Sequence, residues 1–191
     1  MRKVNQCFPL YSSTKLECFK NIENFSSYLY DYAKQRIRLM RDNKNRLYDD
    51  CESVPSKLIT IVKTALKTKT GNCGEKAQLA AIVAQINGIK DCHIAMLYTN
   101  GGRSLDHAVL FVNAQKPYII DPWCGFADYY PNAVVKYENE FGDIFELRKG
   151  ERVTLASEID NEFTEDLRHN FSRGQLNKVL KILPTMKIRK Y

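Results

Sequence analysis

Long apolar runs are absent from this 191-residue sequence. The longest unbroken one, Leu79–Ala84, is far shorter than the roughly 20 residues that a membrane-crossing helix needs. The N-terminal region contains no apolar stretch of the signal-peptide kind. Internal repeats and tracts rich in Gly, Ser or Pro are also absent. We therefore expect a soluble chain without a transmembrane segment or a cleavable signal peptide.

The sequence has no Cys-x-x-Cys pair. Its six cysteines are widely spaced, which favours free thiols in a reducing compartment over a disulfide framework. Free thiols in such a chain are buried, metal-bound or catalytic. The six positions are Cys7, Cys18, Cys51, Cys73, Cys92 and Cys124.

The composition is that of a globular protein, with 44% hydrophobic and 27% charged residues. Its formal net charge of +7 would attract an acidic partner. We expect a single domain over residues 1–191, with an N-terminal helical portion at 1–55, a catalytic core at 56–125, and C-terminal strands and helices at 126–191.

Helical spacing of apolar residues predicts a helix from Ser26 to Arg41 and a second from about Ser53 to Lys67. Asn72 and Glu75 have the spacing of a capping box, which predicts a third helix that ends at Asn87-Gly88. Cys73 would then be the first helical residue.

After Gly88 the pattern becomes extended, and Asn100-Gly101-Gly102 predicts a hairpin turn. We expect a three-stranded antiparallel meander behind the helix that begins at Cys73, and further along the chain another hairpin and two helices. The predicted strands are Cys92–Thr99, Leu105–Asn113 and Tyr118–Asp121; the second hairpin is Phe145–Arg148 with Arg152–Leu155; the helices are Glu158–Leu167 and Gln175–Leu183.

Cys73 is the cysteine predicted to lie at a helix N-terminus, where unpaired N–H groups favour the thiolate. A nucleophilic thiol also needs an imidazole. If the turn after the second strand is centred near Ala114, the residue numbers of paired positions on the two strands sum to about 228. His107 then lies opposite Asp121, on the same face of the sheet. The carboxylate would then orient the imidazole. His93 has no obvious acidic neighbour, and His169 resembles a solvated helix residue.

Backbone N–H groups at Cys73 can bind an oxyanion. For the second donor, Asn72 and Gln115 remain alternatives.

Three motifs together resemble a known family: Gly71-Asn-Cys-Gly-Glu-Lys-Ala77, then Asp106-His107-Ala-Val, then Asp121-Pro122. They are similar to the core of transglutaminase-like enzymes within the papain-like thiol hydrolases, and locally to peptide N-glycanases. The order Cys, His, Asp is also similar to that of bacterial effector and toxin domains that deamidate protein glutamines. The likeness covers about Thr70–Gly125, and the absence of Cys-x-x-Cys knuckles departs from the zinc-bearing N-glycanases.

The resemblance implies an α+β, papain-like fold with Cys73, His107 and Asp121 as nucleophile, base and orienting acid, and with no metal or cofactor. It implies an amide hydrolase or acyl-transfer enzyme acting on a protein substrate, with glutamine deamidation or transglutamination favoured over peptide-bond cleavage. The implied location is the cytoplasm, or a host cytosol for an effector. The alternative of another class is a non-catalytic binding module with a basic face.

For three residues near the predicted site, the sequence leaves both a structural and a functional role open. Glu75 either completes the capping box or takes part in the chemistry. Trp123 either shields the histidine from water or belongs to the core, and Cys124 is either a structural or a regulatory thiol. A zinc site from Cys73, Cys92, His107 and Cys124 lacks the short ligand spacing of such sites. Basic residues form a solvated helix face or contact an acidic substrate surface: Lys57, Lys63, Lys67, Lys69 and Lys76. The basic stretch Lys178–Lys190 needs neither membrane nor nucleic-acid contact to explain it, so we expect no nucleic-acid partner.

Overall fold

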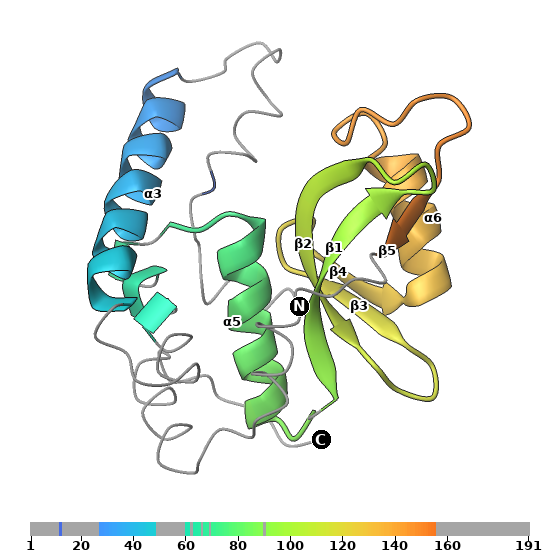
Figure 1. Cartoon of the computed structure of the whole chain (residues 1–191), viewed down its shortest axis with the longest axis horizontal. Coiled ribbons are helices and arrows are strands. Elements are labelled where there is room, and N and C mark those ends of the chain that lie inside the picture. The colour runs from blue at the N-terminus through green and yellow to red at the C-terminus, as the bar shows by residue number, and fades with distance from the viewer. Residues whose placement is uncertain are drawn as a thin grey trace.

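The computed structural model describes residues 12, 27–48, 60–61, 63–65, 67–68, 70–89 and 91–155. These residues form an α+β fold around one antiparallel sheet of five strands in the order β4-β3-β2-β1-β5. The sheet lies between helices α5 and α6, and α3 lies on the side of α5 that faces away from the sheet (Figure 1). In the described part of the chain, no helix is both long enough and apolar enough to cross a membrane.

Helix α3 (Ser27–Tyr48) confirms the first predicted helix and extends seven residues beyond its predicted end. Ala33, Ile37 and Met40 are buried along one side, and Ala33 and Ile37 belong to the apolar pattern that predicted the helix. After Met40 the sequence is almost entirely polar, so periodicity gave no sign that the helix continues. Neither Gly nor Pro interrupts it there.

The second predicted helix is helical at each of its described positions, which continue to residue 68; residues 53–59 lie outside the described part. Thr64 and Thr68 each donate a side-chain hydrogen bond of 2.8 Å to the carbonyl four residues earlier. Such bonds satisfy hydroxyls within a helix.

Helix α5 (Cys73–Ile86) has the predicted bounds and the predicted capping box. The Asn72 N–H donates to Glu75 Oε2 at 3.0 Å. Small and apolar residues around this helix are buried: Ala77, Leu79, Ala80, Ala81, Ile82 and Ala84. A helix that is apolar on several sides belongs in the interior, and α5 indeed lies between α3 and the sheet (Figure 1). Gly88, at φ +84°, follows its end as predicted.

Strands β1 (Cys92–Thr99), β2 (Ser104–Val112) and β3 (Tyr118–Asp121) confirm the meander to within one residue. The register between β2 and β3 differs from the prediction. Leu110 pairs with Ile120 and Val112 with Tyr118, so partners sum to 230 instead of 228. The turn is therefore centred one residue later, which displaces each partner by two positions and keeps every side chain on its expected face.

The predicted hairpin around Lys149-Gly150-Glu151 is wrong. Residues 145 and 146 lie in a turn and residues 147 and 148 have no regular structure, while β5 (Val153–Leu155) pairs with β1. Phe145 is instead buried in the core beside Tyr137. Apolar and polar residues alternate in the segment 145–148, which suggested a strand. Over only four residues, such alternation does not distinguish a strand from a turn with buried side chains.

Strand β4 (Phe126–Tyr129) and helix α6 (Tyr130–Glu140) were not predicted individually. Both β4 and β5 belong to the same sheet as β1–β3, so the segment after residue 125 completes the sheet. The predicted helices Glu158–Leu167 and Gln175–Leu183 lie outside the described residues.

Candidate functional site

Cys73 is the first residue of α5, at the end of the helix that meets the sheet. Its side chain is half-buried and packs against the hydrophobic cluster of the sheet. Its Sγ lies 3.8 Å from the carbonyl oxygen of Asp106, the residue before His107. The start of α5 therefore lies against the first part of β2.

The residue before the histidine has an unusual backbone. Asp106 has φ +47°, a left-handed conformation that is uncommon for residues other than glycine. Between Met96 and Tyr98 the register of β1 with β2 shifts at the same level of the sheet. Such irregularities redirect a strand locally, and here the redirected segment presents the Asp106 carbonyl to Cys73.

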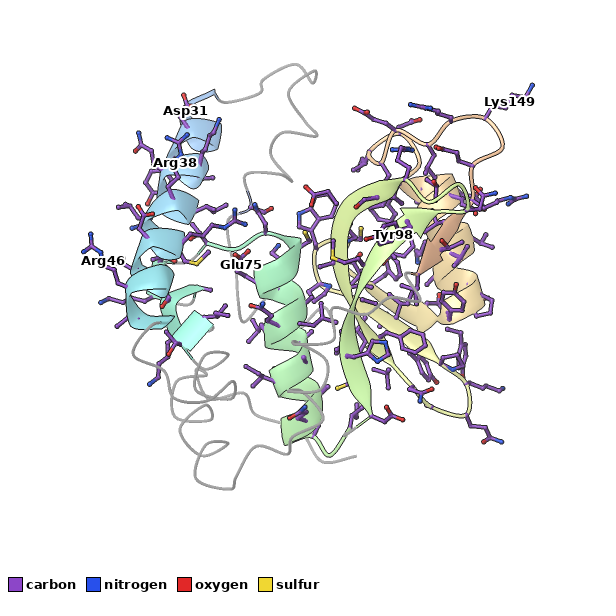
Figure 2. The ribbon with its side chains drawn as sticks, in the orientation of Figure 1. Asp31, Arg38, Arg46, Glu75, Tyr98 and Lys149 are labelled. Carbon is purple, nitrogen blue, oxygen red and sulfur yellow. The ribbon has the colours of Figure 1, made fainter. Side chains whose placement is uncertain are left out.

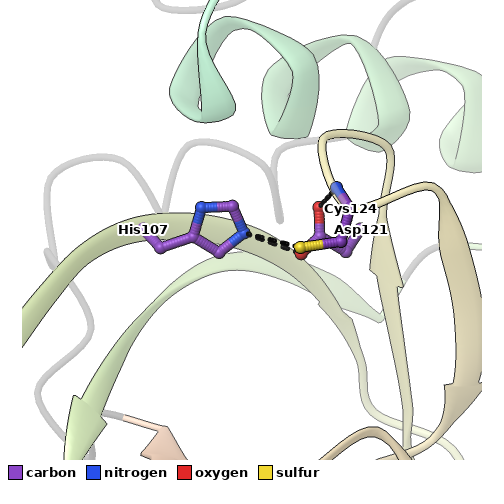
Figure 3. Close-up of side chains that lie close together, drawn as sticks. All are labelled: His107, Asp121 and Cys124. Atoms are coloured by element: carbon purple, nitrogen blue, oxygen red, sulfur yellow. Dashed lines mark hydrogen bonds and ion pairs between the residues drawn. The ribbon is translucent and has the colours of Figure 1, made fainter. Parts of the chain in front are cut away.

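His107 is only 2% exposed. Its Nε2 lies 2.7 Å from Oδ2 of Asp121 (Figure 3). The edge of the ring that carries Nδ1 faces the helix drawn above the site in the same view. Although the β2–β3 register was mispredicted by two positions, the expected contact between His107 and Asp121 is present, because the two side chains share a face.

Asp121 is fully buried and accepts four hydrogen bonds. Oδ1 accepts the backbone N–H groups of Trp123 and Cys124 at 2.8 and 2.9 Å. Oδ2 accepts the Tyr137 hydroxyl at 2.8 Å as well as His107. Burial alone would raise the pKa of Asp121, but the charge and hydrogen bond of His107, with the other donors, lower it.

The same pair determines the charge of the imidazole. Burial would lower the pKa of His107, but attraction to Asp121, their hydrogen bond and a further side-chain hydrogen bond with Cys73 raise the pKa to about 9. The ring thus interacts with the carboxylate and with the thiol. The three residues selected from the sequence, Cys73, His107 and Asp121, lie together in the structure.

Aromatic rings enclose the imidazole. Trp123 meets it edge-on at 5.1 Å between centroids, Phe145 lies at 5.1 Å and Tyr137 at 6.3 Å. Trp123 is itself 4% exposed, so both interpretations of this residue hold: it belongs to the core and covers the histidine. Tyr137 and Phe145 were missed, although with Phe141 they repeat every fourth residue, which is a helical signal.

Ser12 joins the N-terminal region to the site and was also missed. Its hydroxyl donates to Asn72 Oδ1 at 3.0 Å and accepts the Trp123 indole N–H at 3.0 Å. This buried serine connects the residue that caps α5 to the ring over His107. No periodicity could have identified it, because its partners are 60 and 111 residues away.

The neighbours of the nucleophile helix have structural partners. Glu75 is buried, and besides completing the capping box it pairs with Arg41 of α3 at 3.4 Å. Figure 2 shows Asp31, Arg38 and Arg46 on the outer side of α3, while Glu75 lies between α3 and α5. The structural interpretation of Glu75 is therefore the better one.

The structure favours Asn72 over Gln115 as the second hydrogen-bond donor to an oxyanion. Gln115 is exposed in the turn after β2, at the other end of that strand from the histidine, which argues against it. Asn72 remains next to Cys73, with its side-chain oxygen bonded to Ser12. His93 packs against Phe111, and His169 lies outside the described residues.

Cys124 approaches the site, with Sγ 4.0 Å from His107 Nε2. Cys92, by contrast, donates to the Ile89 carbonyl, and burial together with Asp91 raises its pKa to about 11. Among the described residues, the group able to hold a metal ion is His107, Asp121 and Cys124, whose ligand atoms lie within 4.8 Å of one another. Of the zinc set considered from the sequence, His107 and Cys124 belong to this group, Cys73 and Cys92 do not, and Asp121 was omitted.

The basic residues near α5 do not form one solvated face. Lys63 and Lys67 are exposed, but Lys76 is 9% exposed and belongs to the interior. Lys57, Lys69 and the stretch Lys178–Lys190 lie outside the described residues.

Comparison with known protein families and with curated proteins found no match to this chain. The functional argument therefore depends on the geometry of the site.

Proposed function

We propose that this protein is a cysteine-dependent amide hydrolase or acyl-transfer enzyme of papain-like, transglutaminase-like type. Cys73 is the nucleophile, His107 the acid and base, and Asp121 the orienting acid. The observation that carries the proposal is the hydrogen bond between the His107 ring and the buried Asp121 carboxylate, with the Cys73 thiol 3.8 Å from the carbonyl oxygen of the residue before His107. This is the set of roles that thiol catalysis requires.

The charges of the site suit this chemistry. Since Asp121 raises the pKa of His107 to about 9, the ring is an imidazolium near neutral pH and can pair with a Cys73 thiolate. The thiolate attacks the substrate carbonyl, and the imidazolium gives its proton to the departing amine, which leaves a thioester. His107 then takes a proton from water or an acceptor amine as that nucleophile attacks the thioester, and the thiolate is released.

Cys124 is a weaker candidate for the nucleophile. Its sulfur approaches Nε2, the nitrogen already bonded to Asp121. A thiol using that nitrogen would compete with the orienting acid. Cys73 lies at a helix N-terminus, where the first N–H groups lack intrahelical partners and can donate to an oxyanion.

Room for a substrate exists beside Cys73. Apart from its chain neighbours and the backbone of its own helix, no heavy atom of the described residues lies within 4 Å of where a Cβ would be on Gly74. A substrate carbonyl placed against this first turn would meet both the thiolate and the N–H groups of the helix N-terminus.

The substrate class follows from the sequence resemblance and the net charge. The favoured substrate is a glutamine side-chain amide on a protein with an acidic surface, as in effector-type deamidases and transglutaminases. The chain's net charge of +7 supports an acidic partner. Cleavage of a peptide bond uses the same groups and differs in the leaving amine.

Mass spectrometry tests the proposal. The purified chain and its Cys73→Ala variant are incubated with a cell extract, with and without an added primary amine. We expect glutamine converted to glutamate, or linked to the amine, with wild type alone. New peptide termini would identify a protease, and identical spectra for the two chains would contradict the proposal and favour a binding module.

A further inference from the structure

We propose that His107, Asp121 and Cys124 form a binding site for a zinc-like divalent ion, and that the ion switches off the Cys73 centre. The ion site depends on geometry alone, whereas its inhibitory effect rests on the proposed function. The three side chains offer nitrogen, oxygen and sulfur within 4.8 Å of one another. This mixture of donors suits zinc.

The distances are close to those of a tetrahedral site. Zinc binds sulfur at about 2.3 Å and nitrogen or oxygen at about 2.0–2.2 Å, which places neighbouring ligand atoms about 3.3–3.6 Å apart. In the structure Cys124 Sγ is 4.0 Å from His107 Nε2, and Asp121 Oδ2 is 2.7 Å from it. Adjustments of about half an ångström bring the two distances from Nε2 to these spacings. The sulfur and the carboxylate oxygen lie within 4.8 Å of each other, so this pair must approach by up to about 1.2 Å.

The loop after β3 already holds two of the ligands. Asp121 and Cys124 are three residues apart, and the Cys124 N–H donates to Asp121 Oδ1. Since Oδ1 keeps this bond and the one from Trp123, the carboxylate stays oriented while Oδ2 binds the ion. Cys124 is half-buried, whereas the other two ligands are almost fully buried, so the ion would enter on the Cys124 side.

Binding changes the state of the imidazole. Zinc coordination needs a free electron pair on His107 Nε2 and a thiolate on Cys124, so neither ligand atom keeps a proton when the ion is bound. One carboxylate and one thiolate neutralise the two positive charges of the ion. The remaining proton stays on Nδ1, the nitrogen on the Cys73 side of the ring, and His107 can then neither pair with Asp121 nor accept a proton at Nδ1.

Zinc affinity can be measured on the reduced full-length chain by competition with a chromophoric chelator. We expect Cys124→Ala to weaken binding at least ten-fold, and Cys73→Ala and Cys92→Ala to change it less than three-fold. Cys124→Ser, which keeps the side-chain size, serves as a second variant should alanine disturb the fold. Co²⁺ should give a thiolate charge-transfer band that persists in Cys73→Ala and disappears in Cys124→Ser.

Wild-type affinity in the Cys124 variants, or loss of binding in Cys73→Ala, would overturn the ion site. Because no substrate is used, these results are independent of whether the chain is a hydrolase. For the inhibitory effect, zinc should slow alkylation of Cys73 by iodoacetamide in wild type and not in Cys124→Ser. If zinc slowed Cys73 alkylation equally in wild type and in Cys124→Ser, the ion would be binding Cys73 directly. That result would overturn the proposed inhibition through His107.

Discussion

Asp121 is the residue on which the arrangement of the site depends. It is completely buried, and two backbone N–H groups, a tyrosine hydroxyl and an imidazole donate to its two oxygens. A buried carboxylate remains ionised only where such donors compensate for its lost hydration. The Tyr137 hydroxyl is the donor that comes from outside the β2–β3 region, since α6 supplies it.

Tyr137→Phe removes this donor while keeping the ring. Hydrogen bonds to charged groups contribute about 1.5–3 kcal/mol, so we expect the free energy of unfolding to fall by about that amount. Cys73 alkylation should also slow, because Asp121 would hold His107 less firmly. Urea unfolding measures the first effect and mass spectrometry the second.

Tyr130→Phe is the matched control. Its ring packs against Phe111, and no described residue bonds its hydroxyl in the structure. The account predicts a change below about 0.5 kcal/mol for this surface-type substitution. Similar losses in both variants would mean that the Tyr137 hydroxyl has no special role.

At the scale of elements, α5 combines a buried body with an open first turn. Alanines let the helix approach the sheet closely, while Gly74 faces unfilled space next to Cys73. Alanine has a higher helix propensity than glycine by up to about 1 kcal/mol. Glycine at this position is therefore explained better by access to the thiol than by stability.

Gly74→Ala should change stability and reactivity in opposite directions. We expect the free energy of unfolding to rise by up to about 1 kcal/mol. The apparent KM for a protein substrate should also rise, because the methyl group occupies the space beside Cys73. Gly142→Ala provides the contrast: its Cβ would lie 2.6 Å from the Glu138 carbonyl oxygen, so it should destabilise the fold. An unchanged KM in Gly74→Ala would place the substrate elsewhere.

At the scale of the whole molecule, the site forms where separate segments meet. Ser12, the start of α5, β2, the loop after β3 and α6 all contribute, so the assembled fold holds the imidazolium and carboxylate together. The pKa of His107 is raised from its ordinary 6.5 to about 9. A raised pKa contributes stability that is complete below about pH 6.5 and is lost as the pH rises through about 9.

We therefore expect the free energy of unfolding to decrease between pH 6.5 and 9. His107→Gln should show a smaller decrease over this interval, since it has no imidazolium to lose. Urea unfolding at a series of pH values gives both slopes. Parallel slopes would mean that the His107–Asp121 pair does not stabilise the fold through its charge.

The sequence predicted what depends on local patterns. The capping box, the position of Cys73 and the first hairpin follow from residues within a few positions of one another. The His107–Asp121 contact survived an error in register because a two-residue displacement preserves the face of a strand. Ser12 and Tyr137 reach the site through tertiary contacts, which local patterns do not encode.

The most direct test of the central claim compares the rates at which iodoacetamide alkylates individual thiols in the folded chain. Peptide mapping follows Cys73, Cys92 and Cys124 in wild type and in His107→Gln. The account predicts that Cys73 reacts at least ten times faster than the other two, and that this advantage largely disappears in His107→Gln. If Cys73 reacts no faster than Cys124, or if its rate is the same without the imidazole, the thiol and histidine do not form a catalytic pair.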